Sequence, residues 1–147
     1  MKKSVKIELD KILKEYKTFN NINWHNISYE KTLSEDFMRE FKDKLYWDCI
    51  SFYQKLSESF MREFQDKIFW FNISVKQKLS ESFIKEFQDK INWYYISCCQ
   101  KLSNSFIREF KDKLNLDLML ERKKISQNFY NELKHKKTRY QLLDFEE

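Results

Sequence analysis

Residues 47–69 read WDCISFYQKLSESFMREFQDKIF, and residues 70–92 repeat this stretch as WFNISVKQKLSESFIKEFQDKIN. Residues 24–46 and 93–115 carry the same 23-residue pattern, and every copy begins with tryptophan. A period of roughly 20 to 50 residues is typical of stacked supersecondary units, each of which buries its apolar face against its neighbours. The sequence therefore predicts a tandem array in which no single copy folds alone.

Each copy divides into two short helices. In the second copy we expect a first helix of about eight or nine residues, from Trp47 to Lys55. A second helix should begin after Ser57, because a serine hydroxyl accepts hydrogen bonds from the free amides of a first turn. Its apolar residues follow helical spacing and should form one buried face: Phe60, Met61, Phe64 and Ile68. The opposite face offers two pairs of opposite charge, four residues apart: Glu58 with Arg62 and Glu63 with Lys67.

There is no glycine and no proline among the 147 residues. Hairpins rely on glycine, asparagine or aspartate at positive φ, and phosphate-binding loops rely on glycine, so a sheet protein and a nucleotide-binding loop are both disfavoured. Asparagine recurs where copies join, at Asn23, Asn92 and Asn115, and we expect it to end helices there in the left-handed conformation.

These observations predict an all-α fold, an α-solenoid of stacked two-helix repeats. We expect residues 1–147 to form a single repeat domain, with irregular copies at both ends, as a stacked array requires where a unit faces water on one side. The expected parts are a cap at 1–23, four repeats at 24–46, 47–69, 70–92 and 93–115, and a degenerate cap at 116–147.

Variation between the copies is concentrated in the first helix, at positions one, two, five and six after each tryptophan. These positions share one helix face and are unusually aromatic. We consider three explanations: a recognition surface, packing between repeats, or drift at positions that nothing constrains. Drift on a solvated face should yield Lys and Glu, which disfavours the third. The candidate partner-binding residues are Tyr29, Phe52, Tyr53, Phe71, Lys76, Tyr94, Tyr95 and Cys98.

Residues for catalysis or metal binding are sparse. The two histidines, His25 and His135, lie in different copies, and Cys49, Cys98 and Cys99 show no Cys-x-x-Cys spacing. We therefore expect no metal, no cofactor and no enzymatic activity. The odd number of cysteines favours a reducing compartment, so we expect a cytoplasmic protein.

The net charge of +5 raises the possibility of nucleic-acid binding. Between Trp24 and Leu116, however, 15 Lys and Arg face 14 Asp and Glu, so the repeats lack the basic stripe of a phosphate-binding surface. The aromatic face could still stack bases, which keeps nucleic acid as a weaker alternative. A basic cluster near the C-terminal end could contact nucleic acid or a membrane surface, but an exposed basic helix end explains it more simply: Lys134, His135, Lys136, Lys137 and Arg139. No stretch is apolar enough to predict a membrane span.

The string from Ile50 to Ile68, repeated from Ile73, resembles uncharacterised tandem repeats of giant DNA viruses of amoebae, the mimivirus group. This resemblance implies a viral origin, and with it the host cytoplasm as location, but no site residues. Our leading hypothesis is a non-enzymatic scaffold whose first-helix face binds a protein partner. In a virus, this partner could be a host factor. The alternatives are a nucleic-acid or nucleotide-binding module and a self-assembling structural protein.

Overall fold

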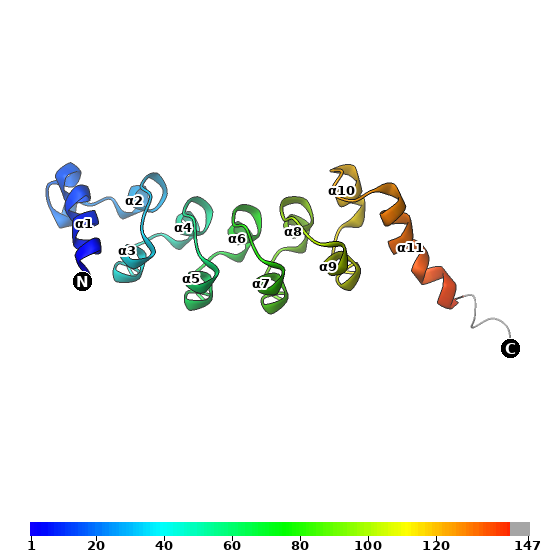
Figure 1. The fold of residues 1–147 in the computed structure, drawn as a ribbon. Helices are drawn as coiled ribbons and strands as arrows, with labels where there is room; N and C mark the ends of the chain where they lie inside the picture. Colours follow the sequence, from blue (N-terminus) through cyan, green and yellow to red (C-terminus); the bar gives the residue numbers. More distant parts are fainter. Residues whose placement is uncertain (142–147) are drawn as a thin grey trace. The chain divides into compact units, whose positions relative to one another are not determined.

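The computed structural model of the protein describes the backbone of residues 1–141 and the side chains of residues 1–134. The described chain is all-helical and confirms the predicted α-solenoid of two-helix repeats (Figure 1). The first helices of the four repeats are α2 (Trp24–Glu30), α4 (Trp47–Tyr53), α6 (Trp70–Lys76) and α8 (Trp93–Cys99). The second helices are α3 (Glu35–Glu40), α5 (Glu58–Glu63), α7 (Glu81–Glu86) and α9 (Asn104–Glu109). The flanking elements are α1 (Lys3–Tyr16), the 3-10 turn η1 (Phe19–Asn21), α10 (Leu116–Glu121) and α11 (Gln127–Gln141).

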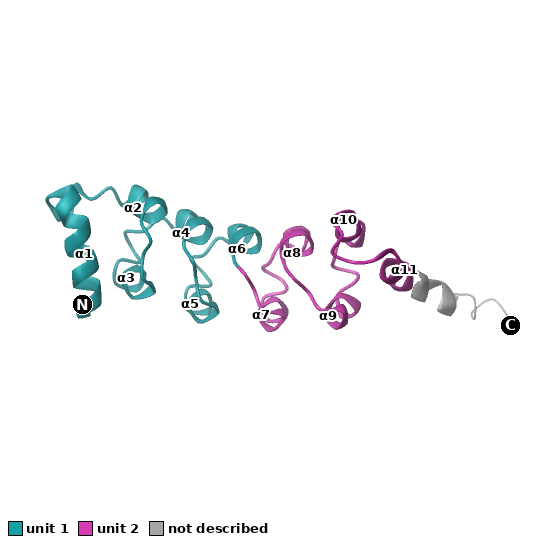
Figure 2. Cartoon of the chain, turned by 45° about the horizontal axis from the view of Figure 1, so that its top comes forward, with its two compact units in different colours: residues 1–77 teal, residues 78–147 magenta. Residues whose placement is uncertain are grey.

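The chain divides into two compact units, residues 1–77 and 78–147 (Figure 2). The boundary falls inside the third repeat, between α6 and α7. Within unit 1, α2 packs on α4 and α4 on α6, while α1 packs on α3. Within unit 2, α8 packs on α10 and α10 on α11. Equivalent helices of successive repeats are thus neighbours in each unit, and the single domain expected above stays a prediction.

The second helices begin as predicted but end earlier. Ser57 Oγ accepts a hydrogen bond from the Phe60 amide at 3.2 Å, and the equivalent serine caps the second helix of each of the four repeats. The helix then stops at Glu63, and the amides of Lys67 and Ile68 both bond to the Phe64 carbonyl at 2.9 and 3.0 Å. The expected continuous helical face to Ile68 is therefore wrong. Phe64 and Ile68 are buried nonetheless, because the turn keeps their side chains toward the core.

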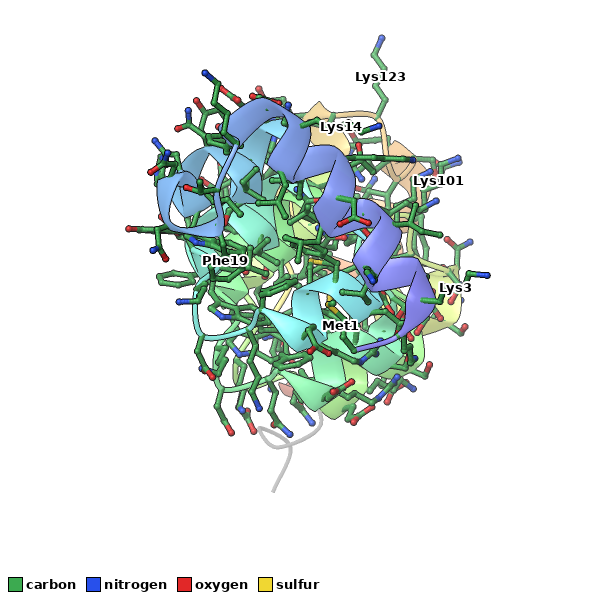
Figure 3. All side chains as sticks on the ribbon, turned by 90° about the vertical axis from the view of Figure 1, so that its left-hand side faces the viewer. Met1, Lys3, Lys14, Phe19, Lys101 and Lys123 are labelled. Atoms are coloured by element: carbon green, nitrogen blue, oxygen red, sulfur yellow. The ribbon has the colours of Figure 1, made fainter. Side chains whose placement is uncertain are left out.

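The junction asparagines do not take the left-handed conformation, so that prediction is wrong. Asn23, Asn92 and Asn115 have φ of −81°, −94° and −82°, and each side chain accepts a hydrogen bond from the amide three residues on. They begin first helices as N-caps rather than ending second helices. Positive φ occurs instead at Lys17 and Lys123 among the described residues, and the Lys123 side chain extends away from the fold (Figure 3).

Ion pairs connect repeats as well as helix turns. Glu58 and Arg62 pair within α5 at 3.7 Å, as predicted. The Glu63–Lys67 pair is not formed, because the helix ends between the two residues. Glu63 instead accepts from Arg39 of the preceding repeat at 2.7 Å, and Lys67 Nζ lies 3.4 Å from an oxygen of Asp43. In unit 2 the same link joins two further pairs: Lys85 with Glu109 and Arg108 with Glu132.

Within each unit, a buried serine links a first helix to the start of the next one. Ser51 Oγ donates to the Trp47 carbonyl at 2.6 Å and accepts from the amide of Phe69 at 2.9 Å. Ser28 makes the equivalent pair of bonds in unit 1 and Ser97 in unit 2. Because all three side chains are fully buried, their hydroxyls satisfy backbone groups that would otherwise be costly to bury.

A buried glutamine at the end of each later first helix forms a second link. Gln54 Nε2 donates to the carbonyls of Ser28 and Lys31 at 2.9 and 2.7 Å, and its Oε1 accepts from the Leu33 amide at 3.0 Å. Gln77 repeats these bonds one copy later, to Ser51, Gln54 and Leu56. We call this arrangement the glutamine clasp. It fixes the spacing of adjacent copies through three backbone groups.

Flanking elements reproduce parts of the repeat. In α1, Glu8 accepts from the amide and the hydroxyl of Ser34 at 3.0 and 2.6 Å, as Glu35 accepts from the amide of Ser57 at 2.7 Å. Helix α1 therefore occupies the position of a second helix ahead of the first repeat. In unit 2, Lys124 Nζ donates to the Gln100 carbonyl at 2.6 Å, and so replaces one bond of a glutamine clasp.

Candidate functional site

The first-helix face predicted from the variable positions is accessible. Tyr53, Phe71 and Tyr94 are at least half exposed, Tyr29 is 37% exposed, and Lys76 is exposed. The remaining three, Phe52, Tyr95 and Cys98, are partly exposed. The framework position three residues after each tryptophan is by contrast fully buried: Ile27, Ile50, Ile73 and Ile96. One helix therefore presents a constant side to the core and a variable side to solvent.

Unit 1 holds five of the eight predicted residues, and they lie in succession on α2, α4 and α6. The Tyr29 and Tyr53 rings are 5.8 Å apart, and the Phe52 and Tyr53 rings are 4.8 Å apart. Lys76 Nζ lies 4.2 Å from the centre of the Phe52 ring, close enough for a cation–π contact. We give the name aromatic face to five residues on these three helices: Tyr29, Phe52, Tyr53, Phe71 and Lys76.

A shallow hollow of about 390 Å³ opens beside the aromatic face. Tyr29, Phe52 and Tyr53 line its aromatic side. Its polar side comes from residues that the sequence analysis placed at variable positions but did not select: His25, Asp48, Cys49 and Asn72. The Asn72 side-chain amide donates to the Asp48 carbonyl at 3.0 Å and so ties α6 to α4. The hollow thus combines ring surfaces with hydrogen-bonding groups.

Within the hollow, Cys49 Sγ lies 3.8 Å from His25 Nε2. The sequence analysis missed this pair, although a spacing of 24 residues in a 23-residue repeat places the two side chains on adjacent first helices. Burial, with the nearby Asp48 carboxylate, raises the pKa of the Cys49 thiol. The thiol therefore stays protonated at neutral pH, and this pair lacks the thiolate of a nucleophilic cysteine.

The tyrosine hydroxyl at the rim is also kept neutral. Tyr29 Oη donates to Glu30 Oε1 at 2.9 Å, and this hydrogen bond to a carboxylate raises the pKa of Tyr29. A protonated phenol beside a carboxylate can exchange hydrogen bonds with a partner but supplies no general base at neutral pH. Among the described residues, no group of three His, Cys, Asp or Glu side chains is placed to hold a metal ion.

Unit 2 carries the other three predicted residues on α8. Tyr94 and Tyr95 contact each other edge to face, with ring centres 5.3 Å apart. Cys98 Sγ lies 3.6 Å from the Tyr95 carbonyl and 3.1 Å from Cys99 Sγ. Burial and the neighbouring Cys98 thiol raise the pKa of Cys99.

The basic cluster predicted near the C-terminal end is described only in part. Lys134 is exposed, and its Nζ lies 3.7 Å from Asp117 Oδ1. The other four members, His135, Lys136, Lys137 and Arg139, lie outside the described side chains. At the other end, Phe19 and Lys3 are exposed on unit 1 (Figure 3). No helix in the described part of the chain has the length and apolar character that crossing a bilayer demands.

Comparisons with protein-family models, with curated proteins and with solved structures found no match to this chain.

Proposed function

We propose that this chain is a non-enzymatic repeat scaffold that binds a protein partner through the aromatic face. The observation that carries the proposal is the contrast within one helix. Positions that hold the fold are constant and buried, whereas Tyr29, Tyr53 and Phe71 are exposed aromatic residues that differ from copy to copy. Exposed aromatic clusters are common at protein interfaces, where they contribute much of the binding energy.

The chemistry of the hollow supports binding rather than catalysis. The raised pKa values of Cys49 and Tyr29 leave both groups neutral at pH 7, and ring surfaces adjoin the polar groups of Asp48 and Asn72. Apolar surface flanked by hydrogen-bonding groups is the composition of a protein interface. The resemblance to giant-virus repeats supports a viral protein whose partner is a host factor in the cytoplasm.

A pair of phenylalanines offers a matched test. Phe69 and Phe71 are both 52% exposed and lie two residues apart, but only Phe71 belongs to the aromatic face. Phe71→Ser should weaken capture of a partner from amoebal extract at least tenfold, by quantitative mass spectrometry, while Phe69→Ser should retain it. The free energy of unfolding of both variants should stay within about 0.5–1 kcal/mol of that of the parent, since neither side chain is buried. Equal capture by the two variants would contradict the proposal.

Two further measurements separate the alternatives. Nucleic-acid binding through the same rings would weaken steeply with salt, so partner capture that persists from 0.1 to 0.5 M NaCl opposes a nucleic-acid module. A self-assembling structural protein would grow in mass with concentration, so a constant monomer mass by sedimentation opposes that alternative.

A further inference from the structure

Three of the tryptophans occupy one recurring environment. The Trp47 indole N–H donates to the Lys42 carbonyl at 2.9 Å, and its ring centre lies 4.8 Å from that of Phe64. Trp70 and Trp93 make the same bond to the carbonyl five residues before them, at 3.1 and 3.0 Å. In the second and fourth repeats the indole thus lies between the preceding turn and the phenylalanine that ends the following second helix, with one carbonyl as its acceptor.

The fifth copy lacks the tryptophan that occupies this environment in three other copies. Leu116 stands where the pattern has tryptophan, and Leu133 stands where the second copy has Phe64. The carbonyl in register with that of Lys42 belongs to Lys111. Two smaller side chains replace two rings, and leucine has no N–H to give to a carbonyl.

The structure contains a hollow of about 560 Å³ at this position, entirely within unit 2. Residues in register with the tryptophan environment line it: Lys111, Leu114, Leu116 and Leu133. Asp117 and Lys134, which lie 3.7 Å apart, are also in the lining. The hollow therefore has an apolar floor, one backbone acceptor whose equivalents bind an indole, and a charged edge.

We propose that this hollow is a docking site for the side chain of a tryptophan on a partner protein. The ring would pack on Leu114, Leu116 and Leu133, and its N–H would donate to the Lys111 carbonyl, as the indoles of Trp47, Trp70 and Trp93 do in their own repeats. The chain itself thus provides three occupied examples of the ligand chemistry. The inference does not rest on the function proposed above, because the aromatic face of unit 1 plays no part in it.

The test uses the full chain and small amide probes, followed by chemical-shift changes in the amide NMR spectrum. N-acetyl-tryptophanamide should shift the amides of Lys113, Asn115 and Leu116 in a saturable way, and N-acetyl-leucinamide should bind about tenfold more weakly. The 1-methylindole analogue lacks the N–H, so it should bind roughly threefold to tenfold more weakly. Free indole tests the alternative that the hollow is a small-molecule site. At such a site, free indole would bind at least as tightly as N-acetyl-tryptophanamide.

Two variants complete the test. Leu116→Trp should fill the hollow, abolish the shifts and raise the thermal unfolding midpoint. Leu118→Trp, on the same helix but outside the hollow, should leave binding unchanged. The proposal is overturned if the tryptophan and leucine probes bind equally, if no shifts occur, or if a folded Leu116→Trp protein still binds. Binding of free indole that is as tight as that of N-acetyl-tryptophanamide, or tighter, would overturn the assignment to a partner's tryptophan. Filling of the hollow by a second copy of this chain at high concentration would also overturn it.

Discussion

Replacing Gln54 by methionine should strongly destabilise unit 1 without changing its apolar packing. The side chain is 5% exposed, and methionine is similar in length. The substitution leaves the Leu33 N–H without its acceptor and the carbonyls of Ser28 and Lys31 without a donor. An unmatched buried donor costs about 1–3 kcal/mol, and carbonyls with two lone pairs cost less. We therefore expect a loss of about 2–4 kcal/mol in the free energy of unfolding.

Urea denaturation followed by far-UV circular dichroism measures this loss. With a slope of about 2 kcal/mol per M, the midpoint should fall by about 1–2 M. Hydrogen exchange adds a local readout, because the Leu33 amide should lose protection before its neighbours. Lys55→Met is the control: its side chain is exposed and adjacent, so the change should stay within about 0.5 kcal/mol. A Gln54→Met protein as stable as this control would refute the clasp.

Gln54→Glu tests the same clasp through its pH dependence. The introduced carboxylate would face two carbonyl oxygens, so the folded-state pKa of residue 54 should rise above its unfolded value. A raised pKa means that stability is fully present below the unfolded pKa of about 4.3 and is lost as the pH rises through the folded pKa. The variant should thus be less stable at pH 7 than at pH 4, relative to the parent at the same two pH values. A pH-independent difference would contradict this prediction.

Other predictions concern single contacts. Ser51→Ala should lower the free energy of unfolding in urea by about 1–3 kcal/mol, because the part-buried Phe69 amide loses its acceptor; a change below about 0.5 kcal/mol would show that the serine link contributes little. Cys49 should react with a thiol-specific reagent at pH 7.5 more slowly than the same cysteine in the unfolded chain, since burial raises its pKa; equal rates would contradict this. The Tyr130 hydroxyl donates to Asp117 and lowers the pKa of that carboxyl. Tyr130→Phe should raise the Asp117 pKa in a carbon-13 NMR titration, and an unchanged value would remove the hydrogen bond as its cause. Because the folded pKa is depressed, the stability from this pair is present above the unfolded pKa and is lost as the pH falls through the folded one.

Local features were within reach of the sequence. The 23-residue period identified the repeats, helical spacing identified both helices of each copy, and Ser57 was recognised as a cap. The helix and cap signals depend on residues within one or two turns of each other, so local backbone geometry determines them. The period needs only a comparison of one copy with the next. The comparison of copies likewise selected an exposed face, because the buried positions of a stacked unit tolerate less change than its surface. Where helices end was harder: Asn92 reads equally well as a helix stop or as the next helix's N-cap.

Contacts between copies depended on the tertiary structure. Gln54 bonds to groups that lie 21 to 26 residues away in the sequence. Arg39 pairs with Glu63, which is 24 residues away, and Cys49 lies beside His25 at the same sequence separation. Helical periodicity carries no information at such separations, because the angle and rise between stacked units decide which side chains meet. The sequence by itself thus determined the repeat, its helices and its exposed face. Only the tertiary structure decided that glutamine and serine join the copies, and that Leu116 leaves a hollow where the other copies hold an indole.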